Sequence, residues 1–181
     1  MQRSDTKGSA TSAKSGNRVT RAFGLTGEKW MRHANPVSVW TRFAVLPLLA
    51  LSIWSRDWIG WWCLIPIALS IVWLVVNPLF FHEPRSTRHW ASKGVLGERI
   101  WTEGDRASFP PEFRSPVPTI ATVFQALGVI VMIYGLAVLD PLAVVGGIVV
   151  AQLAKLWLID RMALLFDAMR SRNAEYASWD F

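Results

Sequence analysis

The sequence predicts an all-α integral membrane protein with four transmembrane helices, arranged as two antiparallel hairpins, plus an interfacial amphipathic helix. Of its 181 residues, 52% are hydrophobic and 18% are charged, against about 45–50% and about 25% in soluble domains. The apolar residues are concentrated in four runs, and the 11 tryptophans lie mostly at the ends of those runs. A soluble fold with four buried helices is the weaker alternative, because little amphipathic sequence remains to cover them.

The first 27 residues differ in composition from the rest of the chain. They are rich in Ser, Thr, Gly, Lys and Ala and have few large apolar side chains. Such a segment cannot bury enough surface to offset its ordering entropy, so we expect residues 1–27 to be a disordered tail. The segment lacks the apolar region of a secretory signal peptide, so the first span should direct insertion. We expect residues 28–175 to form the membrane domain and residues 176–181 a C-terminal tail.

Four apolar runs can cross a bilayer, because a helix needs about 20 apolar residues to span about 30 Å of hydrocarbon. The expected spans are residues 36–55, 58–81, 117–139 and 141–159. The first span includes Arg42 and the last includes Lys155, whose long side chains can reach the headgroups. Very short connections follow the first and third spans, so each pair of spans should be antiparallel neighbours.

The basic residues predict the orientation of the spans. Of 19 Lys and Arg residues, eight precede or begin the first span, six lie in the segment 82–116, and four lie in or after the last span. Only Arg56 falls on the other side. The positive-inside rule therefore places both termini and the segment 82–116 in the cytoplasm, with the spans in the cell inner membrane.

The net charge of +6 follows from this topology and from attraction to anionic lipid headgroups. No aromatic and basic recognition motif accompanies the charge, so we expect the lipid bilayer and its headgroups as partners and no nucleic acid.

The segment 86–101 shows apolar positions at helical spacing, which is typical of a short helix lying on the inner leaflet. Trp90, Gly94, Gly97 and Trp101 fall along one stripe. Glycines at these positions indicate close approach by another helix or a ligand, although a broken helix is an alternative.

The last span has two further patterns. Ala143, Gly147 and Ala151 form a stripe of small residues, which favours packing within the bundle or, as the alternative, homodimerisation or contact with a partner membrane protein. Beyond the expected bilayer, an apolar stripe from Ile159 to Met169 predicts that the helix continues into the cytoplasm.

The expected topology brings the start of the first span and the end of the second together at the cytoplasmic face. The residues collected there are polar, charged or aromatic. This candidate polar cluster consists of His33, Asn35, Trp40, Arg42, Asn77, His82, Glu83, Arg85, Ser86, Thr87 and His89.

Three interpretations of the candidate polar cluster are open. Histidine and carboxylate side chains suit a transition metal, with His33 and His82 as the candidate ligands. Hydroxyls and basic side chains near a helix N-terminus suit a phosphate or an anionic headgroup. That site would be built from Arg42, Arg85, Ser86, Thr87, Arg88 and Lys93. The simplest interpretation is positive-inside charge, with Ser86 or Thr87 capping the helix that follows.

Other chemistries have little support in the sequence. Cys63 lies in an apolar run, where a thiolate would be costly. No phosphate-binding loop, dinucleotide fingerprint or hydrolase nucleophile motif is present, so the sequence identifies no catalytic residue and no cofactor. Gln125 and Gln152 are polar groups within the second hairpin that a solute transporter would need.

Two segments, HANPVSVWTR (33–42) and PRSTRHWASKGVLGERIW (84–101), resemble a family of small prokaryotic multi-span membrane proteins of unknown function. The resemblance extends over Trp30 to Met169. It implies a compact membrane domain and identifies no catalytic residue.

The leading functional hypothesis is a scaffold or accessory subunit with a polar platform on the cytoplasmic face. The alternatives are an inner-face enzyme that depends on lipid or metal, and a transporter of small solutes.

Overall fold

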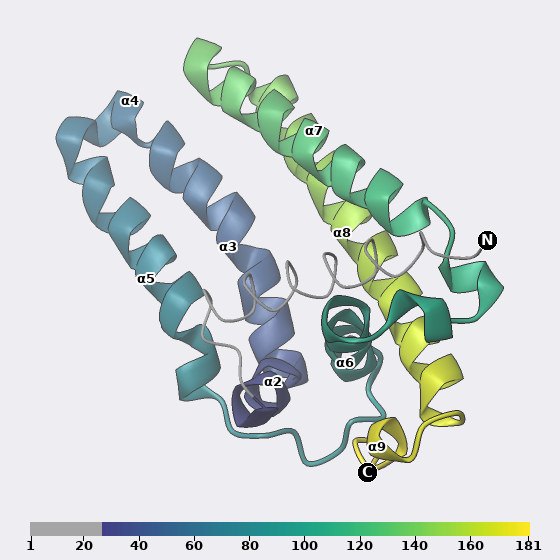
Figure 1. Ribbon diagram of the computed structural model, residues 1–181. Helices are drawn as coiled ribbons and strands as arrows, with labels where there is room; N and C mark the ends of the chain where they lie inside the picture. Colours follow the sequence, from purple (N-terminus) through teal and green to yellow (C-terminus); the bar gives the residue numbers. More distant parts are fainter. Residues whose placement is uncertain (1–26) are drawn as a thin grey trace, which may run out of the picture. The chain divides into compact units, whose positions relative to one another are not determined.

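The computed structural model describes residues 27–181, and the expected disordered tail lies outside them except for Gly27. The described residues form helices and no strands. In chain order the elements are α2 (Gly27–His33), α3 (Pro36–Trp54), α4 (Arg56–Ile59), η1 (Gly60–Cys63), α5 (Leu64–Phe80), α6 (Trp90–Glu103), η2 (Arg106–Ser108), η3 (Pro111–Phe113), α7 (Val117–Val138), α8 (Pro141–Arg170) and α9 (Ala174–Ala177) (Figure 1). The expected all-α class is confirmed for this part of the chain.

The chain divides into two compact units. Unit 1 contains the residues up to Pro36, together with His82–Pro116 and Ile159–Phe181. Unit 2 contains Val37–Phe81 and Val117–Leu158. Helix α8 belongs to both units, because its residues before Ile159 lie in unit 2 and its later residues lie in unit 1.

Within residues 27–181, three segments are long and apolar enough to cross a membrane, as expected of a membrane protein. They are Pro36–Phe80, Pro111–Val138 and Pro141–Arg170. The first segment includes both of the first two expected spans, since it contains α3, α4, η1 and α5. Large apolar side chains on these helices point away from the protein, and the most exposed are Trp61 at 85% and Leu142 at 81%.

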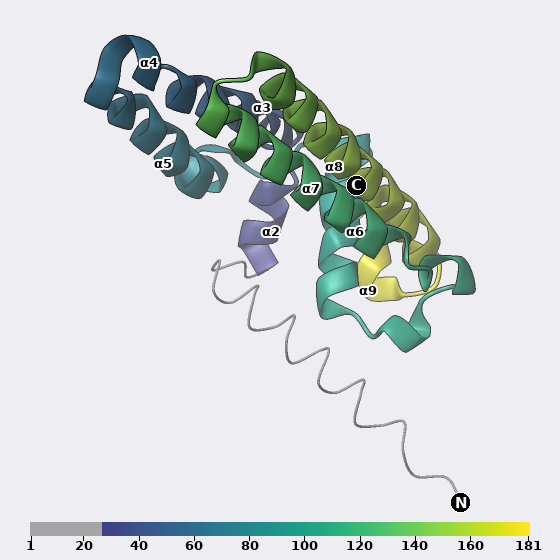
Figure 2. The same ribbon diagram turned by 90° about the horizontal axis from the view of Figure 1, so that it is seen from above.

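In unit 2, α7 and α8 lie side by side in both views (Figures 1 and 2) and approach closely through small residues. A Cβ atom added to Gly128 would lie 2.5 Å from the backbone nitrogen of Ala151, and one added to Gly135 would lie 2.6 Å from that of Val144. Gly147 faces the backbone of Met132 in the same way. The small-residue stripe of α8 therefore lies against α7, where a larger side chain would separate the two backbones.

Helix α3 completes the packing of unit 2. Its Ala50 joins Met132, Leu136 and Val144 in a buried apolar cluster. The turn after α3 is also tied to α7, because the Arg56 guanidinium donates to the carbonyl of Leu136 in the last turn of α7. A cation is favourable at this helix end, where the carbonyls lack partners within the helix.

The connection between α7 and α8 is a tight turn. Leu139 has a φ of 58°, and the next amide, of Asp140, donates to the carbonyl of Gly135 at 2.9 Å. This is the left-handed helix ending that usually carries glycine. The Asp140 carboxylate then caps α8 by accepting from the amide of Leu142 at 2.9 Å, so the turn ends one helix and begins the next.

Unit 1 is organised around α6. Most of its apolar face is buried, including Val95, Leu96 and Ile100. A Cβ atom added to Gly94 would overlap the side chain of Ile159, and one added to Gly97 would overlap the carbonyl of Met162. The glycines therefore allow the α6 backbone to lie against the end of α8, as the sequence pattern indicated.

The end of α8 covers the apolar face of α6. That α6 also lies at the surface of the inner leaflet stays a prediction. Two side-chain contacts accompany the backbone approach: the Trp90 indole donates to Asp160 at 3.2 Å, and the Lys93 ammonium lies 3.0 Å from the Asp167 carboxylate.

The predicted extension of the last helix is confirmed. Helix α8 continues to Arg170, and its apolar stripe in unit 1 is buried. The stripe consists of Ile159, Met162, Ala163, Phe166 and Met169. These side chains are covered by protein because α6 and the segments around it pack on this end of α8.

Candidate functional site

The candidate polar cluster is divided between the two units. Unit 2 holds Trp40, Arg42 and Asn77. Unit 1 holds the other members, which are His33, Asn35, His82, Glu83, Arg85, Ser86, Thr87 and His89.

In unit 2, a buried polar network joins α3 and α5. Asn77 and Ser38 are both fully buried. The Ser38 hydroxyl donates to the Asn77 side-chain carbonyl at 2.6 Å, and the Asn77 amide donates to the Thr41 hydroxyl at 2.8 Å. The Arg42 guanidinium donates to the carbonyl of Ser38 at 3.2 Å. A buried amide among apolar helices must find partners, so this network stabilises the pairing of the two helices.

In unit 1, the segments before α3 and after α5 meet. The Asn35 amide donates to the backbone carbonyl of His82 at 3.0 Å. His33 lies edge-on to the Trp30 ring, with 6.1 Å between ring centroids. The structure thus brings together Asn35 and His82, which the topology expected to be neighbours.

Two features of the histidines bear on the metal interpretation. Within residues 27–181, no group of three His, Cys, Asp or Glu side chains is placed to hold a metal ion. His89 caps α6, because its Nδ1 atom accepts from the amide of Ala91 at 3.1 Å. That nitrogen therefore carries no proton in this arrangement, and its lone pair is used within the protein.

The helix cap differs from the expected one. The sequence predicts Ser86 or Thr87 as the cap of this helix, but the helix begins at Trp90 and His89 is its cap. Helix α5 ends at Phe80, and residues 82–89, which include Pro84, form a non-helical connection. This non-helical connection places the two hydroxyls away from the helix end.

The Ser86 and Thr87 hydroxyls instead bind the C-terminal residues. The Thr87 hydroxyl donates to the carbonyl of Trp179 at 2.7 Å and accepts from the amide of Phe181 at 3.0 Å. The Thr87 amide donates to the carbonyl of Phe181 at 2.9 Å, and the Ser86 hydroxyl donates to the same carbonyl at 2.8 Å. We call these four residues the C-terminal clasp. Residues 176–181, expected as a tail, are bonded within unit 1.

Aromatic and charged side chains extend the clasp toward α6. The Arg99 guanidinium lies 4.2 Å from the centroid of the Trp179 ring and 3.0 Å from Glu103. Glu103 also accepts from the Trp30 indole at 3.0 Å. Charged groups that share partners in this way hold one another in fixed positions, so α2, α6 and the C-terminal residues are linked.

Burial raises the pKa of Tyr176 above its usual value of 10.0, and the carboxylates of Glu175 and Glu103 add to this effect. Arg99 acts in the opposite direction, because a cation lowers the pKa of a phenol. Tyr176 also lies next to the Trp179 ring, at 5.1 Å between centroids. The phenol is therefore held neutral at the edge of the clasp.

A chain of ion pairs joins α6, α8 and the C-terminal residues. Lys93 pairs with Asp167 at 3.0 Å, Asp167 pairs with Arg170 at 3.1 Å, and Arg170 pairs with Asp180. Sequence reasoning assigned none of these acidic residues to the site. One signal was available: Asp167 and Arg170 lie one turn apart, off the apolar stripe of α8, where charged side chains can reach a neighbouring segment.

The arrangement in unit 1 is that of a folded surface rather than an open binding site. The hydroxyls of Ser86 and Thr87, the Nδ1 atom of His89 and the ammonium of Lys93 all bind other groups of unit 1. These groups therefore hold the segments of unit 1 together. Three of them, Ser86, Thr87 and Lys93, belong to the phosphate interpretation.

No curated protein and no solved structure matches this chain. A family model described as a family of unknown function, DUF6653, matches residues 15–179. This range contains both segments that carried the resemblance and extends past the expected range of Trp30 to Met169 at each end. The chain therefore belongs to the DUF6653 family of unknown function.

Proposed function

We propose that this protein is a four-span inner-membrane protein that acts as a scaffold or accessory subunit. In this proposal, α3, α5, α7 and the first part of α8 form two transmembrane hairpins, and both termini lie in the cytoplasm. Unit 1 is then a folded platform on the cytoplasmic face, available to a partner protein.

The division into two units is the observation that carries this proposal. Unit 1 combines three segments far apart in the chain, and these are the segments that the positive-inside rule assigns to the cytoplasm. Unit 2 combines the expected spans. The compact units come from the three-dimensional structure, and the sidedness comes from the basic residues of the sequence. Because both divide the chain at the same places, they support one part in the membrane and one part in the cytoplasm.

The distribution of charge supports the same division. Unit 2 has five charged side chains, namely Arg42, Arg56, Asp57, Asp140 and Lys155, whereas the described residues of unit 1 have 21. Exposed leucine, isoleucine and valine side chains are concentrated on α3, α5, α7 and the first part of α8. Such surfaces are stable in hydrocarbon and would be an aggregation liability in water.

The internal bonding of unit 1 supports a scaffold. The clasp, the ion-pair chain and the Trp30–Glu103 bond hold the segments of unit 1 to one another. A partner would then bind a preformed surface and would not have to order the segments of unit 1, which lowers the entropic cost of association.

Cysteine accessibility tests the topology. In a Cys63→Ser background, single cysteines replace Trp61, Arg88 and Ser171, which are all exposed. A membrane-impermeant maleimide should label Trp61→Cys in intact cells, and the other two variants only after the membrane is permeabilised. Labelling of Arg88→Cys from outside would contradict the proposal.

Composition of the purified protein tests the scaffold role. Native mass spectrometry should find a reproducible protein partner that is lost when exposed platform residues such as Arg88 are changed to Glu, and kept when Leu153 in unit 2 is changed to Ala. A stoichiometric metal that disappears in a His33→Ala and His82→Ala double variant would instead indicate a metal-dependent enzyme.

A further inference from the structure

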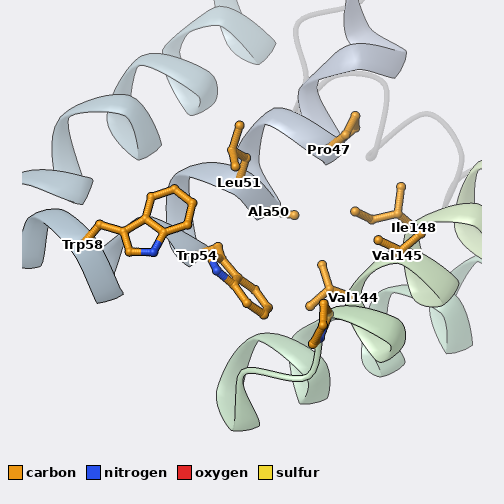
Figure 3. A pocket seen from close by; sticks show the side chains of 9 residues that line it. Pro47, Ala50, Leu51, Trp54, Trp58, Val144, Val145 and Ile148 are labelled. Carbon is orange, nitrogen blue, oxygen red and sulfur yellow. The ribbon is translucent and has the colours of Figure 1, made fainter.

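Unit 2 contains an apolar groove of about 250 Å³. Figure 3 shows its lining side chains, with those of α3 and α4 on one side and those of α8 on the other. The first wall includes Pro47, Leu51, Trp54 and Trp58, and the opposite wall includes Val145 and Ile148. Among the residues that the structure describes, none of those lining the groove is charged.

The floor of the groove is closed. Ala50 and Val144 line the groove but are buried, so they form its base. Both belong to the buried apolar cluster where α3, α7 and α8 meet. A helix with its side chains is about 10–12 Å across, so it cannot enter a space whose two walls already touch at the base. A single flexible hydrocarbon chain can.

The two ends of the groove differ in polarity. Trp54 and Trp58 lie at one end, beside the charged turn residues Arg56 and Asp57. Pro47 lies seven residues earlier on α3, or about 10 Å along the helix axis, among apolar side chains. This gradient suits an amphiphile whose polar group stays at the tryptophan end and whose hydrocarbon lies in the groove.

We propose that the groove holds one acyl chain of a membrane phospholipid. This inference rests on the proposed membrane topology, in which the tryptophan end lies at the outer headgroups. The groove is accessible from outside the protein at Leu51 and Val145, whose side chains are 56% and 59% exposed. A resident chain would cover these side chains and fill the space between α3 and α8.

Photolabelling of the full-length protein tests the proposal. The probe is phosphatidylcholine with a diazirine midway along one acyl chain, present as a minor component of phosphatidylcholine vesicles. After illumination, mass spectrometry maps the labelled residues. We expect labelling at Leu51 and Val145 to exceed that at Leu153, which is equally exposed at 60% but does not line the groove, by at least fivefold.

Filling the groove should remove this preference. Val145→Trp places a large side chain in the groove, whereas the control Val149→Trp, at an exposed position one turn further along α8, does not. The first change should reduce labelling of Leu51 at least fivefold, and the second should leave it within twofold. If Val145→Trp fails to fold, Leu51→Trp and its control Leu48→Trp give the same comparison at Val145.

Three results would overturn the proposal. Uniform labelling around unit 2 would mean that lipid contacts the groove no differently from the rest of the surface. An equal loss of Leu51 labelling in Val145→Trp and Val149→Trp would also mean that lipid does not prefer the groove. Efficient crosslinking between two copies through Leu51→Cys, in a Cys63→Ser background, would mean that a second copy covers the groove.

Vesicle flotation separates the two proposals. A protein that floats with the vesicles but labels uniformly contradicts the groove proposal alone. A protein that does not associate with vesicles contradicts the membrane topology as well.

Discussion

The side-chain amide of Gln152 on α8 donates a hydrogen bond of 2.7 Å to the backbone carbonyl of Phe43 on α3. Within a helix, that carbonyl would accept from the amide four residues later. The residue there is Pro47, inside α3, and proline has no amide hydrogen. Gln152 therefore supplies the donor that Pro47 lacks. The amide that sequence reasoning considered for a solute path has a structural role between two apolar helices.

Replacing Gln152 with Leu should destabilise the protein by about 1–2 kcal/mol, because a partly buried carbonyl between apolar helices loses its partner. In a Pro47→Ala background the helix regains its own donor, so the same replacement should have little effect. Unfolding in mixed detergent micelles measures both values, and Gln125→Leu on α7 is the matched control. An equal loss in both backgrounds would show that Gln152 acts through something other than this carbonyl.

Glycines in α6 and α8 should respond in opposite ways to alanine. Gly97→Ala places a methyl group against the carbonyl of Met162, so α6 must move away from α8, at a cost of about 1–3 kcal/mol. A Cβ atom at Gly146 meets nothing within 4 Å, so Gly146→Ala should stabilise the helix by up to about 1 kcal/mol. Thermal unfolding measures the two changes.

Hydrogen exchange provides the local readout for this pair. Gly97→Ala should speed exchange of the amides of α6, while Gly146→Ala should leave them unchanged. If both variants were equally stable, the glycines of α6 would be tolerated for reasons unrelated to its contact with α8.

Features that depend on the spacing of residues within one helix could be predicted from the sequence. Apolar runs identified the segments able to cross a membrane, and the glycines of α6 indicated that another backbone approaches it. The stripe from Ile159 to Met169 correctly extended α8 beyond the expected span. Each of these depends on spacing within one helix, which the sequence displays directly.

Contacts between distant segments could not be predicted in the same way. Periodicity shows that one face of α6 is apolar, but lipid and protein can cover an apolar face equally well, and here the end of α8 covers it. The clasp joins Thr87 to Phe181, 94 residues apart, through hydroxyl and backbone groups that have no distinctive pattern. The same hydroxyls were open to interpretation as a phosphate site because donor chemistry alone does not identify the acceptor.

Thr87→Val should release the C-terminal residues. Valine keeps the shape of threonine but removes the hydroxyl that binds Trp179 and Phe181, so two partly buried backbone groups lose a partner. We expect faster hydrogen exchange and proteolysis near Trp179, together with a loss of about 1–3 kcal/mol. Thr87→Ser should retain most of the stability.

The matched control for the clasp is Thr102→Val on α6. Its hydroxyl donates only to the carbonyl of Glu98 in the same helix, at 2.7 Å. This change should leave the C-terminal residues protected. Equal exposure of those residues in the two variants would mean that the Thr87 hydroxyl does not hold them.

The stability of unit 1 should fall in strong alkali because of Tyr176. Burial raises the pKa of this phenol in the folded protein above 10.0, and Glu175 and Glu103 raise it further against the opposing effect of Arg99. The unfolded chain then ionises first. The stability contributed by the neutral phenol is complete below pH 10 and is lost as the pH rises through the folded pKa.

The chain has two tyrosines, so the tyrosinate absorbance of the protein minus that of Tyr176→Phe isolates Tyr176. Its midpoint should lie above 10 and move down in Glu175→Gln, whereas a midpoint at or below 10 would show that the phenol is open to water and that the edge of the clasp is not closed.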